Sequence, residues 1–191
     1  MNKYYSYFCS SIGNRDAVFD DALGFFKNKP INILEIGSAR NLNPYNRMSD
    51  GWSSFHFYRY IRQNGGSLTT CDIDEGAVIT YNQMFEGLSA HNREIICVDG
   101  LSKIGPQYDL IYLDGGDNPA DMLNQLNLID LKTQVVLCDD FSIKGTQCKI
   151  EHPNYVLYHW EESSHEMALY KHGRSGKILL KQNQTSVTIN L

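Results

Sequence analysis

Short apolar runs recur along the chain, and each ends at a polar or turn-forming residue. The first clear run, Ile-Asn-Ile-Leu-Glu-Ile, occupies residues 31–36 and is followed by Gly37. A run of this length, with Lys29 and Pro30 in front and a glycine behind, is typical of a strand covered on both faces. Further runs lie at residues 67–72, 94–99, 108–114 and 135–140. The pattern predicts five buried strands.

Stretches with apolar residues at helical spacing lie between these runs. We expect helices at residues 14–26, 51–63 and 75–89. A fourth helix is predicted to begin at Asn118-Pro119, where proline takes the first helical position, which tolerates it. Strands that alternate with helices in this way predict a parallel sheet.

The pattern changes near both ends of the chain. Residues 1–13 are rich in aromatic side chains and show no clear period. Two β-like runs at 154–160 and 166–171 are separated by a short polar turn, which indicates a hairpin. Residues 177–191 contain two further β-like runs. We therefore predict a single α/β domain over residues 1–191, with a Rossmann-like, doubly wound, mostly parallel sheet and a C-terminal antiparallel hairpin.

Composition and charge restrict the class of protein. The 191 residues are 42% hydrophobic, which suits one globular domain rather than a disordered chain. A net charge of −5 argues against nucleic acid or an anionic membrane as the main partner. No run approaches the ~18 apolar residues of a membrane span, and the N-terminus lacks a signal-peptide core. Five cysteines form no CxxC pair, so we expect buried thiols and a cytoplasmic protein.

Acidic residues end four of the predicted strands. They are Asp72, Asp99, Asp114 and the pair Asp139-Asp140. The carboxyl ends of parallel strands line the crevice in which α/β proteins bind ligands, so these side chains should meet there. Any one of them is most simply a helix cap. Several like charges at one edge, however, require a cation, a metal or hydroxyl groups as partners.

Two short motifs connect this edge with a known family. Glu35-Ile-Gly37 matches a Glu-x-Gly that opens a cofactor loop, and Gly51-Trp-Ser53 matches a later Gly-aromatic-Ser. From about residue 32 to 160 the chain resembles the class I S-adenosylmethionine-dependent methyltransferases. Within that group it is most similar to the small metal-dependent O-methyltransferases of the catechol, caffeoyl-CoA and sugar types.

The resemblance implies a binding site for S-adenosylmethionine. In that site Asp72 chelates the ribose hydroxyls, because one carboxylate can accept hydrogen bonds from both. The remaining implied cofactor contacts are Glu35, Gly37, Ser38, Gly51, Trp52, Ser53, Asp99, Ser102 and Asp114. Asp99 and Ser102 among them correspond to the adenine contacts, and residues 51–53 to the contacts with the methionine part.

The resemblance also implies a divalent metal, most simply Mg²⁺. The family has one aspartate after the fourth strand and an acid pair after the fifth, which Asp114 and Asp139-Asp140 match. Mg²⁺ prefers oxygen ligands, and a bound metal would lower the pKa of a substrate hydroxyl and orient it.

Two residues are candidates for the general base that would deprotonate the acceptor. Where the family has a lysine or a histidine, three residues after Asp114, this chain has Asp117. Asp117 is either the base, an extra metal ligand or a cap of the following helix. Lys144, four residues beyond the acid pair, is the other candidate base and is otherwise a surface lysine.

The expected activity is methyl transfer from S-adenosylmethionine to a hydroxyl of a small molecule, a sugar or a phenol, with a divalent metal assisting. The alternatives are a metal-independent methyltransferase, in which the acid pair only caps the sheet, and a non-catalytic S-adenosylmethionine-binding protein. A nicotinamide-dependent oxidoreductase shares the ribose-binding acid, but no GxGxxG follows residue 36. Residues 1–13 and 177–191 are the candidate surfaces for a homodimer.

Overall fold

The computed structural model describes residues 2–13, 15–44, 52–114, 124–125, 127–129, 133 and 135–139, and the backbone of 155–161, 167–172, 178–182 and 185–189. In chain order the elements are α1 (Lys3–Ser10), α2 (Asp16–Gly24), β1 (Ile31–Ile36), α3 (Ser53–Asn64), β2 (Gly66–Asp72), α4 (Glu75–Met84), β3 (Arg93–Cys97), the 3₁₀ helix η2 (Gly100–Lys103), β4 (Leu110–Leu113), β5 (Val135–Cys138), β6 (Tyr155–Glu161), β7 (Met167–His172), β8 (Ile178–Gln182) and β9 (Thr185–Ile189).

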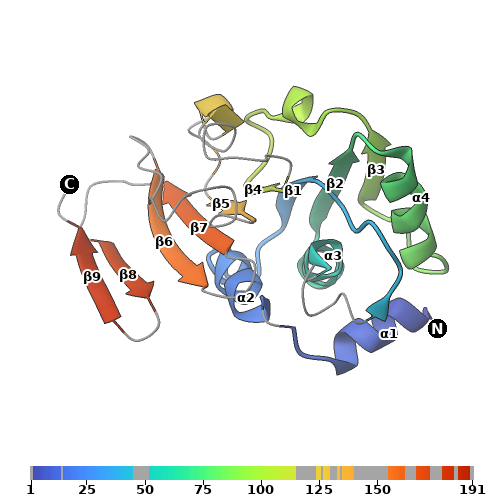
Figure 1. Cartoon of the computed structure of the whole chain (residues 1–191), viewed down its shortest axis with the longest axis horizontal. Coiled ribbons are helices and arrows are strands. Elements are labelled where there is room, and N and C mark those ends of the chain that lie inside the picture. The colour runs from blue at the N-terminus through green and yellow to red at the C-terminus, as the bar shows by residue number, and fades with distance from the viewer. Residues whose placement is uncertain are drawn as a thin grey trace.

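The described strands form one sheet, in the order β3-β2-β1-β4-β5-β7-β6-β8-β9 (Figure 1). The first five are parallel to one another. Strand β7 lies antiparallel between β5 and β6, and β8 and β9 form a second antiparallel pair. The predicted fold class is therefore confirmed. The chain runs outward from β1 through β2 to β3 and then returns to β4, so the strand order reverses at β1, where ligands bind in such sheets.

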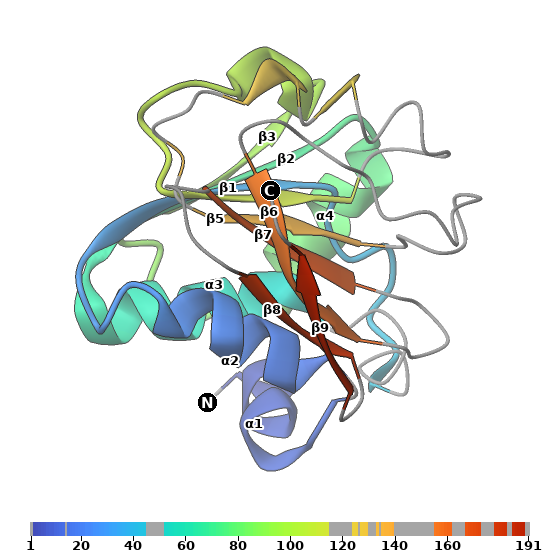
Figure 2. The same ribbon diagram turned by 90° about the vertical axis from the view of Figure 1, so that its left-hand side faces the viewer.

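The central strands are buried on both faces, which explains their continuous apolar runs. Alternate side chains of β1, β4 and β5 enter two different hydrophobic clusters. One cluster contains Ile31, Ile33, Leu110, Tyr112, Val135 and Leu137, and the other contains Leu34, Ile36, Ile111, Leu113, Val136 and Cys138. Helices α2 and α3 cover the first face (Figure 2), where Phe19 and Phe57 pack against Tyr112.

Helix α1 lies in the N-terminal segment, where no helical period was recognised in the sequence. Asn2 caps it, because its side-chain oxygen accepts the N–H of Tyr5 at 2.7 Å. The rings of Tyr5 and Phe8 each pack 5.5 Å from that of Phe55 in α3. The side chains that attach α1 to α3 are aromatic. Because α1 is only about two turns long, its apolar spacing is too short to be recognised as helical in the sequence.

Some predicted boundaries and burials need correction. Strand β3 ends at Cys97, so Asp99 follows the strand by two residues, and helix α4 ends at Met84 rather than near residue 89. Cys71 is buried as expected, whereas Cys97 is exposed. The predicted helix from residue 118 lies mostly outside the described residues. Among those that are described, no helix is both long and apolar enough to cross a membrane.

Gly66 opens β2 in a conformation that only glycine adopts readily. Its φ is +100°, and a Cβ at this position would lie 1.8 Å from the carbonyl oxygen of Ile31 in β1. Gly66→Ala is therefore expected to lower the free energy of unfolding by about 2–3 kcal/mol, measured by urea denaturation. Gly65→Ala is the matched control, since its φ is +84° and its Cβ would meet only Pro30, at 3.5 Å. Equal losses in the two variants would contradict this account.

Candidate functional site at the carboxyl edge of the sheet

The turn after β1 is packed against the end of β4. Gly37 has a φ of +89°, and a Cβ there would lie 3.0 Å from the backbone oxygen of Asp114. The Asp114 N–H donates to the Ile36 carbonyl at 2.9 Å. Glycine is thus required for the chain to turn while it touches β4, and the half-buried Asp114 side chain begins beside this turn.

The carboxylate of Asp72 lies on the other side of the same turn. Its Oδ2 accepts the backbone N–H of Ser38 at 2.9 Å and the Ser38 hydroxyl at 3.2 Å. Its Oδ1 accepts the N–H of Asp74 at 3.0 Å. A carboxylate has about four acceptor positions, so these bonds leave capacity for a ligand hydroxyl, and the Ser38 hydroxyl could yield another. Asp72 contacts Ser38, and Asp114 lies against Gly37. Both acids are therefore at the turn after β1, as the sequence predicted.

An apolar surface lies next to Asp72. Ile73 is 77% exposed, although it directly follows a buried strand. The Ile73 carbonyl lies 3.9 Å from the thiol sulfur of Cys97 at the end of β3. A large exposed apolar side chain that follows a hydroxyl-binding carboxylate in the chain suits a ligand that carries both an apolar ring and hydroxyl groups.

Glu35 lies beneath this edge and faces α3. Its Oε1 accepts the Ser53 hydroxyl at 2.5 Å, and its Oε2 accepts the hydroxyls of Ser54 and Thr70, each at 2.7 Å. The side chain is fully buried, and burial raises its pKa to about 7 despite these donors. These hydrogen bonds join β1 and β2 to the first turn of α3. The cofactor contact expected of Glu35 stays a prediction.

The residues expected to hold the methionine part of a cofactor have other contacts. Ser53 donates to Glu35, and Trp52 is buried with its ring 6.3 Å from that of Tyr4 and 6.1 Å from that of Tyr7. Gly51 lies outside the described residues. Trp52 and Ser53 thus provide no exposed surface at the β1 turn.

Asp99 directly precedes η2 and Ser102 lies in it, so neither residue is part of a strand. Asp99 caps the 3₁₀ helix, since its side chain accepts the Leu101 N–H at 2.9 Å, and the Ser102 hydroxyl donates to the Asp99 carbonyl at 2.7 Å. Both residues are exposed. A Cβ on Gly100 would lie 2.7 Å from the Ile36 side chain, so η2 packs directly on the end of β1.

Asp139 reaches the same edge, but its carboxylate is buried in an ion pair. Its Oδ2 accepts hydrogen bonds from the Arg15 guanidinium and from the Tyr112 hydroxyl, the latter at 2.6 Å. Burial raises the pKa of Tyr112 well above its usual value, and the carboxylates of Asp114 and Asp139 raise it further, so the phenol stays protonated and donates. Arg15 was not among the residues predicted from the sequence, where it is only part of the helix expected at residues 14–26.

The predicted metal site is not supported by these contacts. One oxygen of the Asp139 carboxylate, Oδ2, already faces a guanidinium. Within the described parts of the chain no three His, Cys, Asp or Glu side chains are grouped so that they could hold a metal ion. Asp140 and the candidate bases Asp117 and Lys144 lie outside the described residues.

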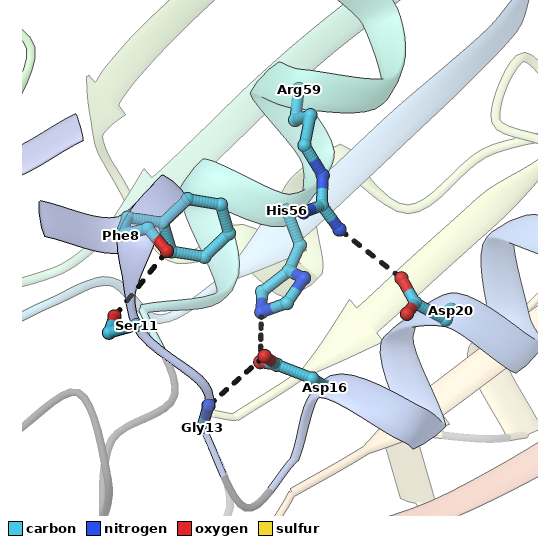
Figure 3. Close-up of polar contacts among 7 residues, drawn as sticks. All are labelled: Phe8, Ser11, Gly13, Asp16, Asp20, His56 and Arg59. Atoms are coloured by element: carbon cyan, nitrogen blue, oxygen red, sulfur yellow. Dashed lines mark hydrogen bonds and ion pairs between the residues drawn. The ribbon is translucent and has the colours of Figure 1, made fainter. Parts of the chain in front are cut away.

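A second polar surface lies between α2 and α3, away from the strand ends. Figure 3 shows an ion pair there between Arg59 and Asp20, with a nitrogen–oxygen distance of 3.2 Å. The surface forms a groove, which is lined by Asp20, Leu23, Gly24, Asn28, His56, Arg59, Tyr60, Gln63 and Asn64. None of the predicted site residues that the structure describes lies in it.

No family model matches the sequence, and no curated protein matches it either. Solved structures do share its fold. The magnesium protoporphyrin IX methyltransferase of Synechocystis PCC 6803, with bound S-adenosylmethionine, has a TM-score of 0.55 and 14% identity, over 83% of this chain and 77% of that one. An RNA methyltransferase from Salinibacter ruber, in complex with S-adenosylhomocysteine, has a TM-score of 0.53 and 14% identity, over 83% and 92%. Human methyltransferase-like protein 13, also with S-adenosylhomocysteine, has a TM-score of 0.52 and 16% identity, over 90% and 83%.

These neighbours include an enzyme that acts on RNA and one that acts on a porphyrin, by their names. The chain therefore has the fold of S-adenosylmethionine-dependent methyltransferases. TM-scores of 0.52–0.55 show the shared fold, and identities of only 14–16% leave the substrate to be argued from the residues at the strand ends.

Proposed function

We propose that this chain binds S-adenosylmethionine at the carboxyl edge of β1, β2 and β4 and transfers its methyl group to a small-molecule acceptor. The observation that carries the proposal is the placement of Asp72. Its carboxylate is oriented by the backbone N–H groups of Ser38 and Asp74, and it lies beside the Gly37 turn at the strand-order reversal.

The residues at this edge fit the cofactor by their chemistry. The Asp72 carboxylate accepts hydrogen bonds from ribose hydroxyls, and Ile73 offers an apolar surface for the adenine ring. When bound, S-adenosylmethionine supplies a methyl group on a positively charged sulfur, which is already a good electrophile. The negative carboxylates of Asp72 and Asp114 favour a cationic ligand at this edge.

The acceptor is proposed to be a hydroxyl of a sugar or a phenol. Asp114 begins beside the Gly37 turn and is only half buried, so its carboxylate can take a proton from a hydroxyl placed there. The overall charge of −5 favours a small acceptor over RNA or DNA. Roles for Asp117 and Lys144 as alternative bases remain predictions from the sequence. No step is assigned to a metal, because the contacts of Asp139 do not fit one.

A nicotinamide-dependent oxidoreductase is the second candidate, because its ribose would bind an acid after β2 in the same way. Titration calorimetry distinguishes the two functions. Saturable heat with S-adenosylhomocysteine and none with NADH is the expected result, and heat with NADH alone would overturn the proposal.

Transfer itself requires a separate measurement. With methyl-tritiated S-adenosylmethionine and a panel of sugars and phenols, label is expected to appear in at least one acceptor. Binding of S-adenosylhomocysteine without transfer to any member of the panel would favour the non-catalytic alternative.

A further inference from the structure

The ion pair between Arg15 and Asp139 is enclosed by protein. Arg15 is 3% exposed and Asp139 is 2% exposed, and Tyr112 donates to the same carboxylate oxygen as the guanidinium. Taking two charges out of water is costly, and such a pair persists only when the partners and their hydrogen bonds are well matched. This contact joins the connection before α2 to the end of β5, across 124 residues of sequence.

The position of Arg15 is fixed by contacts on both sides. Its own carbonyl begins α2 by accepting the N–H groups of Val18 and Phe19, at 3.1 and 3.2 Å. The next residue, Asp16, accepts the Gly13 N–H at 3.0 Å and lies 3.1 Å from the Nε2 atom of His56 in α3 (Figure 3).

His56 is itself held rigidly. Its ring stacks on Phe19 with a centroid distance of 4.3 Å and meets the edge of Phe8 at 4.7 Å. Two adjacent residues, Arg15 and Asp16, thus make polar contacts with two different elements. The backbone at Arg15 is therefore fixed, and its guanidinium reaches Asp139 from a defined position.

We propose that Arg15 is the resident cation of the strand-end edge and occupies the position at Asp139 that a divalent metal would take. The guanidinium is always charged and neutralises the carboxylate without any ion from solution. A metal at the same oxygen would face this positive charge at close range, or would have to displace the guanidinium from Oδ2. The inference stands whether or not the edge binds S-adenosylmethionine.

The first test measures thermal unfolding of the full chain in MgCl₂ and in NaCl at equal ionic strength, with EDTA in the second sample. The wild-type Tm is expected to agree between the two within about 1 °C. A rise of several degrees in MgCl₂ that is lost in Asp139→Asn would overturn the inference. A rise that persists in Asp139→Asn supports it, because the ion then binds without Asp139.

If Asp139→Asn does not fold, an NMR experiment on wild-type protein labelled with nitrogen-15 can test whether a metal binds at Asp139. Mn²⁺ broadens the NMR signals of nuclei close to its binding site. Signals of Asp139 and of the Arg15 side chain that stay sharp support the inference, and selective broadening of both overturns it.

A double-mutant cycle tests the pairing itself. Arg15→Met and Asp139→Asn are each expected to lower Tm by roughly 10 °C, and the double variant to lose clearly less than the sum. Arg15→Lys should recover part of the loss, because it keeps the charge. Asp20→Asn is the control, since the Arg59–Asp20 pair is exposed and its loss should leave Tm nearly unchanged. Strictly additive losses from Arg15→Met and Asp139→Asn would overturn the pairing.

Discussion

Asp72→Asn is expected to weaken the binding of S-adenosylhomocysteine by tenfold to a hundredfold, a loss of about 1.5–3 kcal/mol. The variant keeps the size of the side chain and removes the negative charge that ribose hydroxyls would bind. An amide oxygen can still accept the Ser38 N–H, but the amide nitrogen then faces the Asp74 N–H, which Oδ1 of Asp72 now accepts. Titration calorimetry at one pH and ionic strength gives the two dissociation constants.

Asp109→Asn is the matched control for this measurement. Asp109 precedes β4, at the opposite edge of the sheet, where its side chain accepts the Asn32 N–H at 2.9 Å. An asparagine oxygen can keep that bond, so the affinity of Asp109→Asn for S-adenosylhomocysteine should equal that of the wild type. An unchanged affinity in Asp72→Asn, or an equal loss in both variants, would refute the assigned ribose contact.

The second large effect concerns the pH dependence of stability. Burial raises the pKa of Glu35 from 4.5 to about 7, so the folded state binds its proton more tightly than the unfolded state does. The resulting stabilisation is complete below pH 4.5 and is lost as the pH rises through 7. Over this window Glu35 is expected to lower the free energy of unfolding by about 3 kcal/mol.

Glu35→Gln isolates this contribution from that of every other titrating group. Glutamine has the shape of the protonated acid and can share hydrogen bonds with Ser53, Ser54 and Thr70 after their hydroxyls rotate. Urea unfolding from pH 4.5 to 8 should therefore show wild-type stability falling relative to Glu35→Gln. Parallel curves for the two proteins would mean that the Glu35 pKa is close to its ordinary value.

The architecture was readable from the sequence because local pattern determines it. Apolar runs closed by Gly37 or by an aspartate predicted strands buried on both faces, and β1, β2, β4 and β5 occupy those runs. The polar turn between the last two long β-like runs predicted the β6–β7 hairpin. Because parallel strands bring their carboxyl ends to one edge, the meeting of Asp72 and Asp114 at the β1 turn followed from the same pattern.

The partners of the buried acids were not readable in this way. Glu35 is satisfied by Ser53, Ser54 and Thr70, which lie on α3 and β2, and Asp139 by Arg15, 124 residues away. An acid that ends a strand has the same local sequence whether it faces a ligand or a guanidinium. The choice between them depends on how the elements pack, and that is why a metal site was predicted at Asp139.

The central claim is that a nucleoside-bearing cofactor binds beside Asp72 at the β1 turn. Backbone amide NMR of the full chain during titration with S-adenosylhomocysteine tests it most directly. We predict the largest shifts at Ser38, Ile73 and Asp74, with small shifts around His56 and Asn64 in the groove between α2 and α3. Shifts confined to that groove, or none at saturating ligand, would contradict the account.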